Sequence, residues 1–172
     1  MSIENFRQLA DYNHWANCRL YAVALALPDE QYRCSTGVFF GSLHGTLNHL
    51  LLTDRVWLRR LTGEGDHPLR LDAILFEDRN ELARARIAED ARLKQVVSGY
   101  SDADLAAPLS YKTMSGAPQQ QMLKDILLHL FNHQTHHRGH AHACCSIVTG
   151  GEPPSLDLLQ FQRGVPAPKL DV

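Results

Sequence analysis

Six of the ten histidines lie between Leu127 and Ile147, in a stretch without proline. Apolar residues recur there at helical spacing, which predicts one helix. At about 100° per residue, five of the six fall within an arc of about 100° on one helix face. The sixth, His142, points to the opposite side. The five on the shared face are His129, His133, His136, His137 and His140.

His133 and His137 are four residues apart, so their imidazoles lie one turn apart and can converge on one metal ion. Paired histidines of this spacing bind zinc in the H-E-x-x-H metalloproteases, whose glutamate is the general base. Here Gln134 stands at the glutamate position. Because a glutamine amide cannot accept a proton at neutral pH, the pattern predicts a metal-binding pair without protease chemistry.

A pair of histidines is not a complete site, so the chain must supply another ligand. His49 is a candidate because it lies among apolar residues and needs a polar partner if buried. A His140–Cys144 pair on the same face is a rival, although a buried small thiol is the favoured interpretation of Cys144. His129 and His140 are candidates for substrate or supporting roles beside the pair. The alternative without metal is a face of hydrogen-bonded or exposed histidines.

Composition is typical of a globular protein, with 172 residues and 44% hydrophobic content. This length predicts a single domain over 1–172. The net charge of −2 and the absence of a basic run argue against a nucleic-acid partner. We find no signal peptide and no apolar run long enough to span a membrane, so we expect no membrane partner and a cytoplasmic protein with reduced cysteines.

Helical periodicity and stop signals predict an all-α protein, a four-helix bundle whose ligands project inward from facing helices. A short extra helix capped by Ser155 follows, and the tail 165–172 is predicted to be loose. The connection from Asp102 to Gln121 is expected to form a short hairpin or an irregular crossover and to roof the site. The four long helices are predicted at about 3–27, 42–61, 77–99 and 120–149.

A site rich in imidazole and poor in carboxylate favours Zn²⁺, Ni²⁺, Cu²⁺ or Fe²⁺ over Mg²⁺ or Ca²⁺. We expect zinc or nickel, with iron as an alternative. The remaining histidines are assigned no chemistry. His14 and His44 are expected to be surface or packing residues, and His67 and His142 to lie on the surface.

Several short motifs, spread over nearly the whole chain, resemble the DinB family of YfiT-like metalloenzymes. They are Tyr12-Asn13-His14-Trp15-Ala16-Asn17, Asn48-His49-Leu50, Asp54-Arg55-Val56-Trp57-Leu58, Asn132-His133-Gln134-Thr135-His136-His137-Arg138-Gly139 and Pro153-Pro154-Ser155-Leu156-Asp157. The resemblance implies an up-down-down-up four-helix bundle that binds a divalent metal through His49, His133 and His137. It also implies a homodimer. Some proteins similar to this one are S-transferases or isomerases that use a low-molecular-weight thiol.

Three histidine ligands leave a fourth position for water, a thiolate or a substrate atom. Two enzyme hypotheses follow for a small-molecule substrate: thiol transfer to an electrophile, or metal-assisted hydrolysis by activated water. Hydrolysis usually needs a nearby base, and Asp54 lies about 140° round the helix from His49. Asp157 can approach only if the last helix folds back. This shortage favours thiol chemistry, and a non-catalytic metal-binding stress protein is the third hypothesis.

Overall fold

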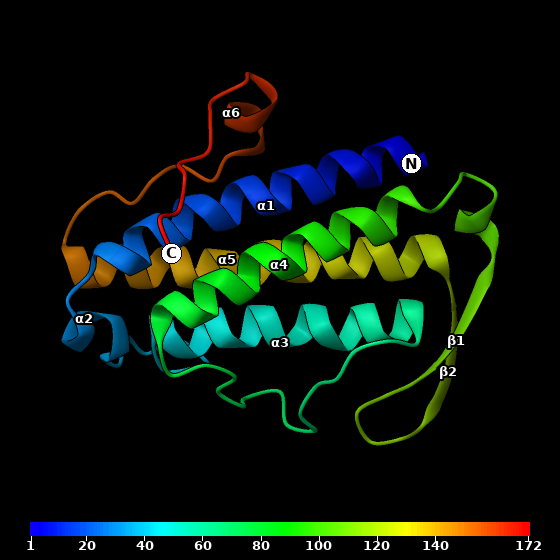
Figure 1. Cartoon of the computed structure of the whole chain (residues 1–172), viewed down its shortest axis with the longest axis horizontal. Coiled ribbons are helices and arrows are strands. Elements are labelled where there is room, and N and C mark those ends of the chain that lie inside the picture. Colours follow the sequence, from blue (N-terminus) through cyan, green and yellow to red (C-terminus); the bar gives the residue numbers. More distant parts are fainter.

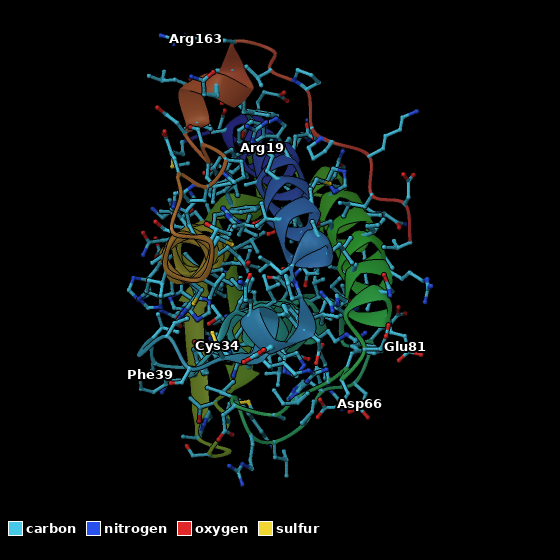
Figure 2. The ribbon with its side chains drawn as sticks, turned by 90° about the vertical axis from the view of Figure 1, so that its left-hand side faces the viewer. Arg19, Cys34, Phe39, Asp66, Glu81 and Arg163 are labelled. Carbon is cyan, nitrogen blue, oxygen red and sulfur yellow. The ribbon has the colours of Figure 1, made fainter.

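The computed structural model describes residues 1–172 and contains four long helices lying side by side (Figure 1). Viewed along the bundle, they surround a common core (Figure 2). In Figure 1, α1 and α5 run in one direction, and α3 and α4 run in the other. These directions agree with the predicted up-down-down-up order. The four helices are α1 (Ile3–Ala26), α3 (Leu43–Thr62), α4 (Arg79–Ser98) and α5 (Leu123–Thr149).

A small antiparallel hairpin at one end of the bundle departs from the predicted all-α chain and confirms the first of the two alternatives expected for the connection from Asp102 to Gln121. Its strands are β1 (Pro108–Lys112) and β2 (Pro118–Met122), with Leu109 paired to Gln121. Because residues up to Met122 belong to this pairing, α5 starts at Leu123 and not near Gln120 as predicted. Three short helices complete the fold: α2 (Asp29–Arg33), η1 (Asp104–Ala106) and α6 (Leu158–Gln162).

Capping residues set most of the helix boundaries. The Ser42 side chain accepts a hydrogen bond from the backbone N–H of Gly45 at 3.1 Å, as expected for the start of α3. Gly63 ends that helix in the left-handed conformation, with φ of 78°. The last short helix differs from its prediction, because Asp157 caps α6 in place of Ser155.

Two apolar clusters, one toward each end of the bundle, form the core. Each contains side chains from all four long helices; Phe6 and Leu127 belong to one, Leu20 and Leu47 to the other. A layer of buried polar side chains separates the two clusters along every long helix. This layer consists of Asn13, Asn17, Asp54, Arg86, Asp90, Gln134 and Arg138.

The C-terminal segment, for which the sequence predicts a loose tail, makes several contacts with the bundle. The Trp15 indole N–H donates to the carbonyl of Val165 at 2.7 Å, and Leu170 and Val172 pack against an apolar cluster. The adjoining helix α6 lies over α1, on the side of α1 away from α3 (Figure 1). No helix combines the length and the apolar character that crossing a bilayer requires.

Candidate metal centre

Three histidines from two facing helices come together between α3 and α5. One ring nitrogen each from His49, His133 and His137 lies within 4.8 Å of the others. The ring centroids are 4.4 Å apart for His133 and His137 and 4.5 Å apart for His49 and His137. Tetrahedral zinc with bonds of about 2.0–2.1 Å holds its nitrogens about 3.4 Å apart. Small side-chain rotations would therefore bring the three nitrogens to ligand distance.

A hydrogen bond fixes the orientation of the His49 ring. Its Nδ1 lies 2.8 Å from the backbone carbonyl of Leu71. Because a carbonyl oxygen only accepts hydrogen bonds, Nδ1 carries the proton and the lone pair lies on Nε2. Nε2 is buried and has no hydrogen-bond partner in the protein. An unpaired buried acceptor is costly, whereas a metal ion at this position would satisfy it.

The Phe40 side chain covers the other side of the same imidazole. Its ring stacks on His49 with centroids 3.7 Å apart and meets His137 edge-on at 5.5 Å. The neighbouring Phe39 is 85% exposed and contacts Phe40 from outside. Sequence reasoning missed both Phe40 and the Leu71 carbonyl. The only available signal was the pair of phenylalanines just before the Ser42 cap, which does not identify what they contact.

The three imidazoles are kept neutral by their surroundings. Burial, together with the neighbouring histidines, lowers the pKa of His133 to about 3 and that of His137 to about 4. Burial also lowers the pKa of His49. Neutral imidazoles retain the lone pairs that a metal ion needs, so the cluster is chemically ready for a cation at neutral pH.

A second group of histidines adjoins the first and shares His137 with it. His136, His137 and His140 also place one nitrogen each within 4.8 Å of the others. All three come from α5, and His136 is exposed. The group that includes His49 is the better candidate, because a hydrogen bond already holds the His49 ring with its free nitrogen buried.

The structure separates several other sequence candidates from the histidine groups. Cys144 is fully buried, lies 3.1 Å from the Thr36 hydroxyl, and belongs to neither group. Burial raises the pKa of its thiol, which disfavours the thiolate that would bind a metal. His129 also belongs to neither group, although its ring lies beside that of His133, with centroids 5.8 Å apart, and packs edge-on against Trp57 at 5.1 Å. Asp157 caps α6, and Asp54 belongs to the buried polar layer.

The hairpin was expected to roof the site, but its aromatic side chain contacts Trp57 and not the three candidate ligands. Tyr111 on β1 meets Trp57 edge-on at 5.4 Å, and Trp57 in turn contacts His129. The direct aromatic cover of His49 and His137 comes from Phe40. The long loop between α3 and α4 supplies the Leu71 carbonyl behind His49. Two irregular segments, one before and one after α3, therefore border the histidines.

Three of the other histidines make polar contacts with an aspartate or with backbone carbonyls. His14 Nδ1 lies 3.3 Å from Asp90, and His44 is buried with Nε2 3.0 Å from the Phe76 carbonyl. His142, predicted to lie on the surface, is half-buried with Nε2 3.2 Å from the carbonyl of Pro154. None of these three belongs to a histidine group.

The fold and the site together define a class of helical protein that presents histidines from two facing helices of a bundle. The family model described as DinB family matches residues 1–168, and the chain belongs to this family. "Protein DinB" of Bacillus subtilis strain 168 is 26% identical over 136 residues, which cover 77% of this chain and 79% of the relative. A crystal structure of a DinB-like protein from Bacillus cereus ATCC 10987 shares the fold, with a TM-score of 0.69 and 20% identity, over 90% of this chain and 97% of that one.

Proposed function

We propose that the protein binds one divalent metal ion through His49, His133 and His137 and uses it in a reaction on a small molecule. Zinc or nickel suits three neutral imidazoles best, and iron is an alternative. The observation that carries the proposal is the buried, unpartnered Nε2 of His49, held toward the other two rings by the bond from Nδ1 to Leu71. Three ligands leave a coordination position open, as in catalytic sites.

Within this proposal, thiol-dependent S-transfer is the reaction that the site supports best. A bound divalent ion of this kind lowers the pKa of a thiol or of water at its open position. The potential metal ligands that group at the site are all histidines, so no carboxylate belongs to the group as the base that hydrolysis usually uses. A low-molecular-weight thiol attacking an electrophilic substrate needs no such carboxylate.

Metal-dependent hydrolysis is the second candidate, and one observation favours it. His136 and His140 lie beside His137, with ring centroids 4.8 Å and 5.2 Å from it, respectively. A neutral imidazole at this distance can accept a proton from water in place of a carboxylate. A non-catalytic metal-binding protein is the third candidate, and it is the one expected to show no turnover with any substrate.

Metal content of untagged protein, measured by elemental analysis for the wild type and His49→Ala side by side, tests the site. We expect about one equivalent in the wild type and almost none in the variant. Metal-loaded wild type is then assayed with electrophiles, with and without thiols, and with ester and amide substrates. Thiol-dependent turnover supports S-transfer and thiol-independent turnover supports hydrolysis. No metal in the wild type, even after incubation with Zn²⁺ or Ni²⁺, contradicts the proposal.

The family resemblance implies a homodimer, and we propose one for this chain. The small net charge and the absence of an apolar run long enough to span a membrane lead us to expect that it acts in the cytoplasm on a small molecule, without nucleic acid or membrane as a partner. Light scattering during size-exclusion chromatography measures the mass of the particle, and a mass equal to one chain of 19.3 kDa contradicts the dimer.

A further inference from the structure

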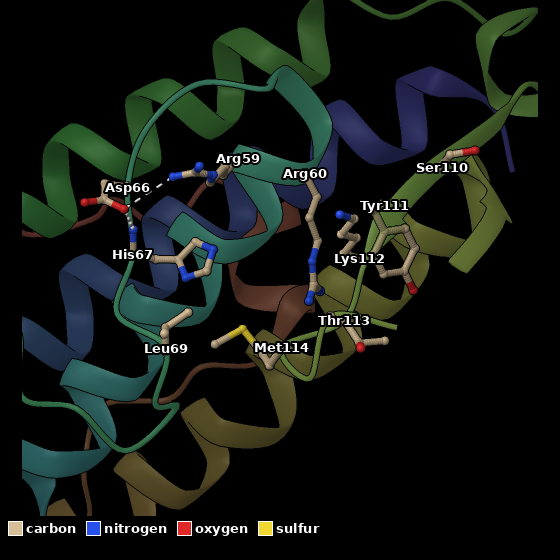
Figure 3. A pocket seen from close by; sticks show the side chains of 11 residues that line it. Arg59, Arg60, Asp66, His67, Leu69, Ser110, Tyr111, Lys112, Thr113 and Met114 are labelled. Carbon is tan, nitrogen blue, oxygen red and sulfur yellow. Dashed lines mark hydrogen bonds and ion pairs between the residues drawn. The ribbon is translucent and has the colours of Figure 1, made fainter. Parts of the chain in front are cut away.

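Two cationic side chains without an anionic partner line a cavity beside the hairpin. The cavity has a volume of about 660 Å³ and lies between the end of α3, the following loop and β1 (Figure 3). Arg59 at its edge is neutralised by Asp66, with Nη1 3.3 Å from the carboxylate. Arg60 and Lys112 take part in no ion pair and no side-chain hydrogen bond of the structure. Their two positive charges are therefore uncompensated.

The Arg60 guanidinium is held in place by aromatic rings and not by a carboxylate. Its central carbon lies 4.4 Å from the Trp57 ring centroid and 4.9 Å from that of Tyr111. Contacts of this kind fix the guanidinium plane while its N–H groups stay free at the edge. Burial without a counter-ion lowers the pKa of Arg60, as expected for a charge that lacks a partner. An anion in the cavity would supply that partner.

The cavity and the candidate metal centre border the same segments. Trp57 contacts Arg60 on one side and the His129 ring on the other, and the His129 ring lies 5.8 Å from that of His133. The loop after α3 also serves both places. His67 and Leu69 line the cavity, and the Leu71 carbonyl orients His49. Trp57 and the loop after α3 therefore connect the cavity to the side chains around the histidines.

We propose that this cavity is an anion subsite, in which Arg60 and Lys112 bind a carboxylate or phosphate group of the small-molecule substrate or cosubstrate. The planar N–H pattern of Arg60 matches two oxygens of such a group, and Lys112 adds a second positive charge. The volume is within the range of small-molecule sites. That the cavity binds an anion does not depend on the proposed function. That this anion belongs to a molecule whose other end reaches the metal centre rests on the proposed function.

Calorimetric titration of untagged protein with succinate, inorganic phosphate and neutral succinamide tests the subsite. We expect the anions to bind and succinamide not to bind. Arg60→Gln should weaken anion binding by about tenfold or more, since hydrogen bonds between charged groups are stronger than those between neutral groups. Lys112→Gln should weaken it as well. Whichever anion binds more tightly identifies the group, carboxylate or phosphate, that the cavity accepts.

Matched variants separate this inference from the metal proposal. Arg163→Gln removes an exposed arginine beside α6, far from the cavity, and should leave anion binding unchanged (Figure 2). His137→Ala should also retain anion binding, and Arg60→Gln should retain the metal content of the wild type. Equal binding by the wild type and Arg60→Gln, or no binding of either anion, overturns the subsite. Anion binding that is lost with His137→Ala but kept with Arg60→Gln places the anion on the metal and also overturns it.

Discussion

The Gln134 side-chain amide donates a hydrogen bond to Oδ1 of Asp54 over 2.6 Å, and both residues are buried. The other carboxylate oxygen of Asp54 lies 2.8 Å from the Arg86 guanidinium. Gln134 follows His133 directly, yet it points into the polar layer between the two apolar clusters. The glutamine at the position of a protease glutamate is therefore a structural donor that joins α5 to α3.

Replacing Gln134 by glutamate would complete an H-E-x-x-H pattern, and we expect it to destabilise the fold without creating protease activity. The new carboxylate would face Asp54, whose pKa burial already raises to about 6. An uncompensated buried charge costs about 3 kcal/mol or more. Urea denaturation at pH 7 measures the loss. The loss in the free energy of unfolding should be smaller at pH 5 than at pH 7. At pH 5 the facing carboxylates of the folded variant bind a proton, whereas those of the unfolded chain remain ionised.

Gln134→Leu is the matched control for that substitution. It removes the hydrogen bonds that the amide donates to Asp54 and to the Leu50 carbonyl without adding charge, so it should cost about 1–3 kcal/mol. Equal stability of the glutamate and leucine variants at pH 7 would contradict the account of two facing carboxylates.

Much of the fold was predictable because its signals are local. The long helices follow from apolar periodicity, and Ser42 at the start of α3 follows from cap chemistry. The sequence predicted the hairpin only as one of two alternatives for its connection, because Gln119, Gln120 and Gln121 have little strand propensity and their pairing depends on β1. Helix α2 is a single short turn inside a connection, where propensity carries little information.

The candidate site likewise has parts that follow from local sequence and parts that depend on tertiary structure. The i, i+4 spacing of His133 and His137 is a property of one helix, so the sequence alone could predict it. His49 was selected from several possible ligands by family resemblance, because its distance from α5 depends on helix packing. Phe40 and the Leu71 carbonyl lie on irregular segments, and their contacts depend on the tertiary structure. The partner of Gln134 is 80 residues away in the chain.

The two histidine groups make different predictions for metal binding. His133→Ala should abolish it, because His133 belongs only to the group that contains His49. His136→Ala and His140→Ala should retain about one equivalent, since those residues belong only to the other group. Elemental analysis of untagged variants measures the content. Loss of metal with His140→Ala and retention with His133→Ala would place the ion in the outer group instead.

Phe40→Ala should weaken metal binding without changing its stoichiometry. The substitution removes the ring that stacks on His49 at 3.7 Å and admits water to the site. Loss of a group that orients a ligand typically lowers metal affinity by about tenfold or more. Competition with a chromophoric chelator measures the affinity. Phe39→Ala is the control, because Phe39 is 85% exposed and contacts only its neighbour Phe40 among aromatic rings, so it should bind metal like the wild type.

Removal of metal with a chelator should leave the protein folded. Two clusters of 14 buried residues each form the core, and neither includes a histidine. Circular dichroism of the metal-free protein should therefore retain the helical signal, unlike that of a zinc finger. Added metal should raise the thermal midpoint, by the equivalent of about 2.7 kcal/mol at a free concentration of about 100 times Kd. A random-coil spectrum after chelation would contradict this expectation.

His14 should make the stability of the protein depend on pH in the alkaline range. Its hydrogen bond to Asp90, together with Cys18, raises the pKa of His14 from 6.5 to about 10. A raised folded-state pKa means that this stabilisation is fully present below pH 6.5 and is lost as the pH rises toward about 10. His14→Gln should therefore be less stable than the wild type at pH 6, and the difference should narrow toward pH 10. The effect should be modest because the side chain is 37% exposed to solvent. Denaturation of both proteins across this range checks the prediction, and a difference that stays constant with pH would exclude a charged His14–Asp90 pair.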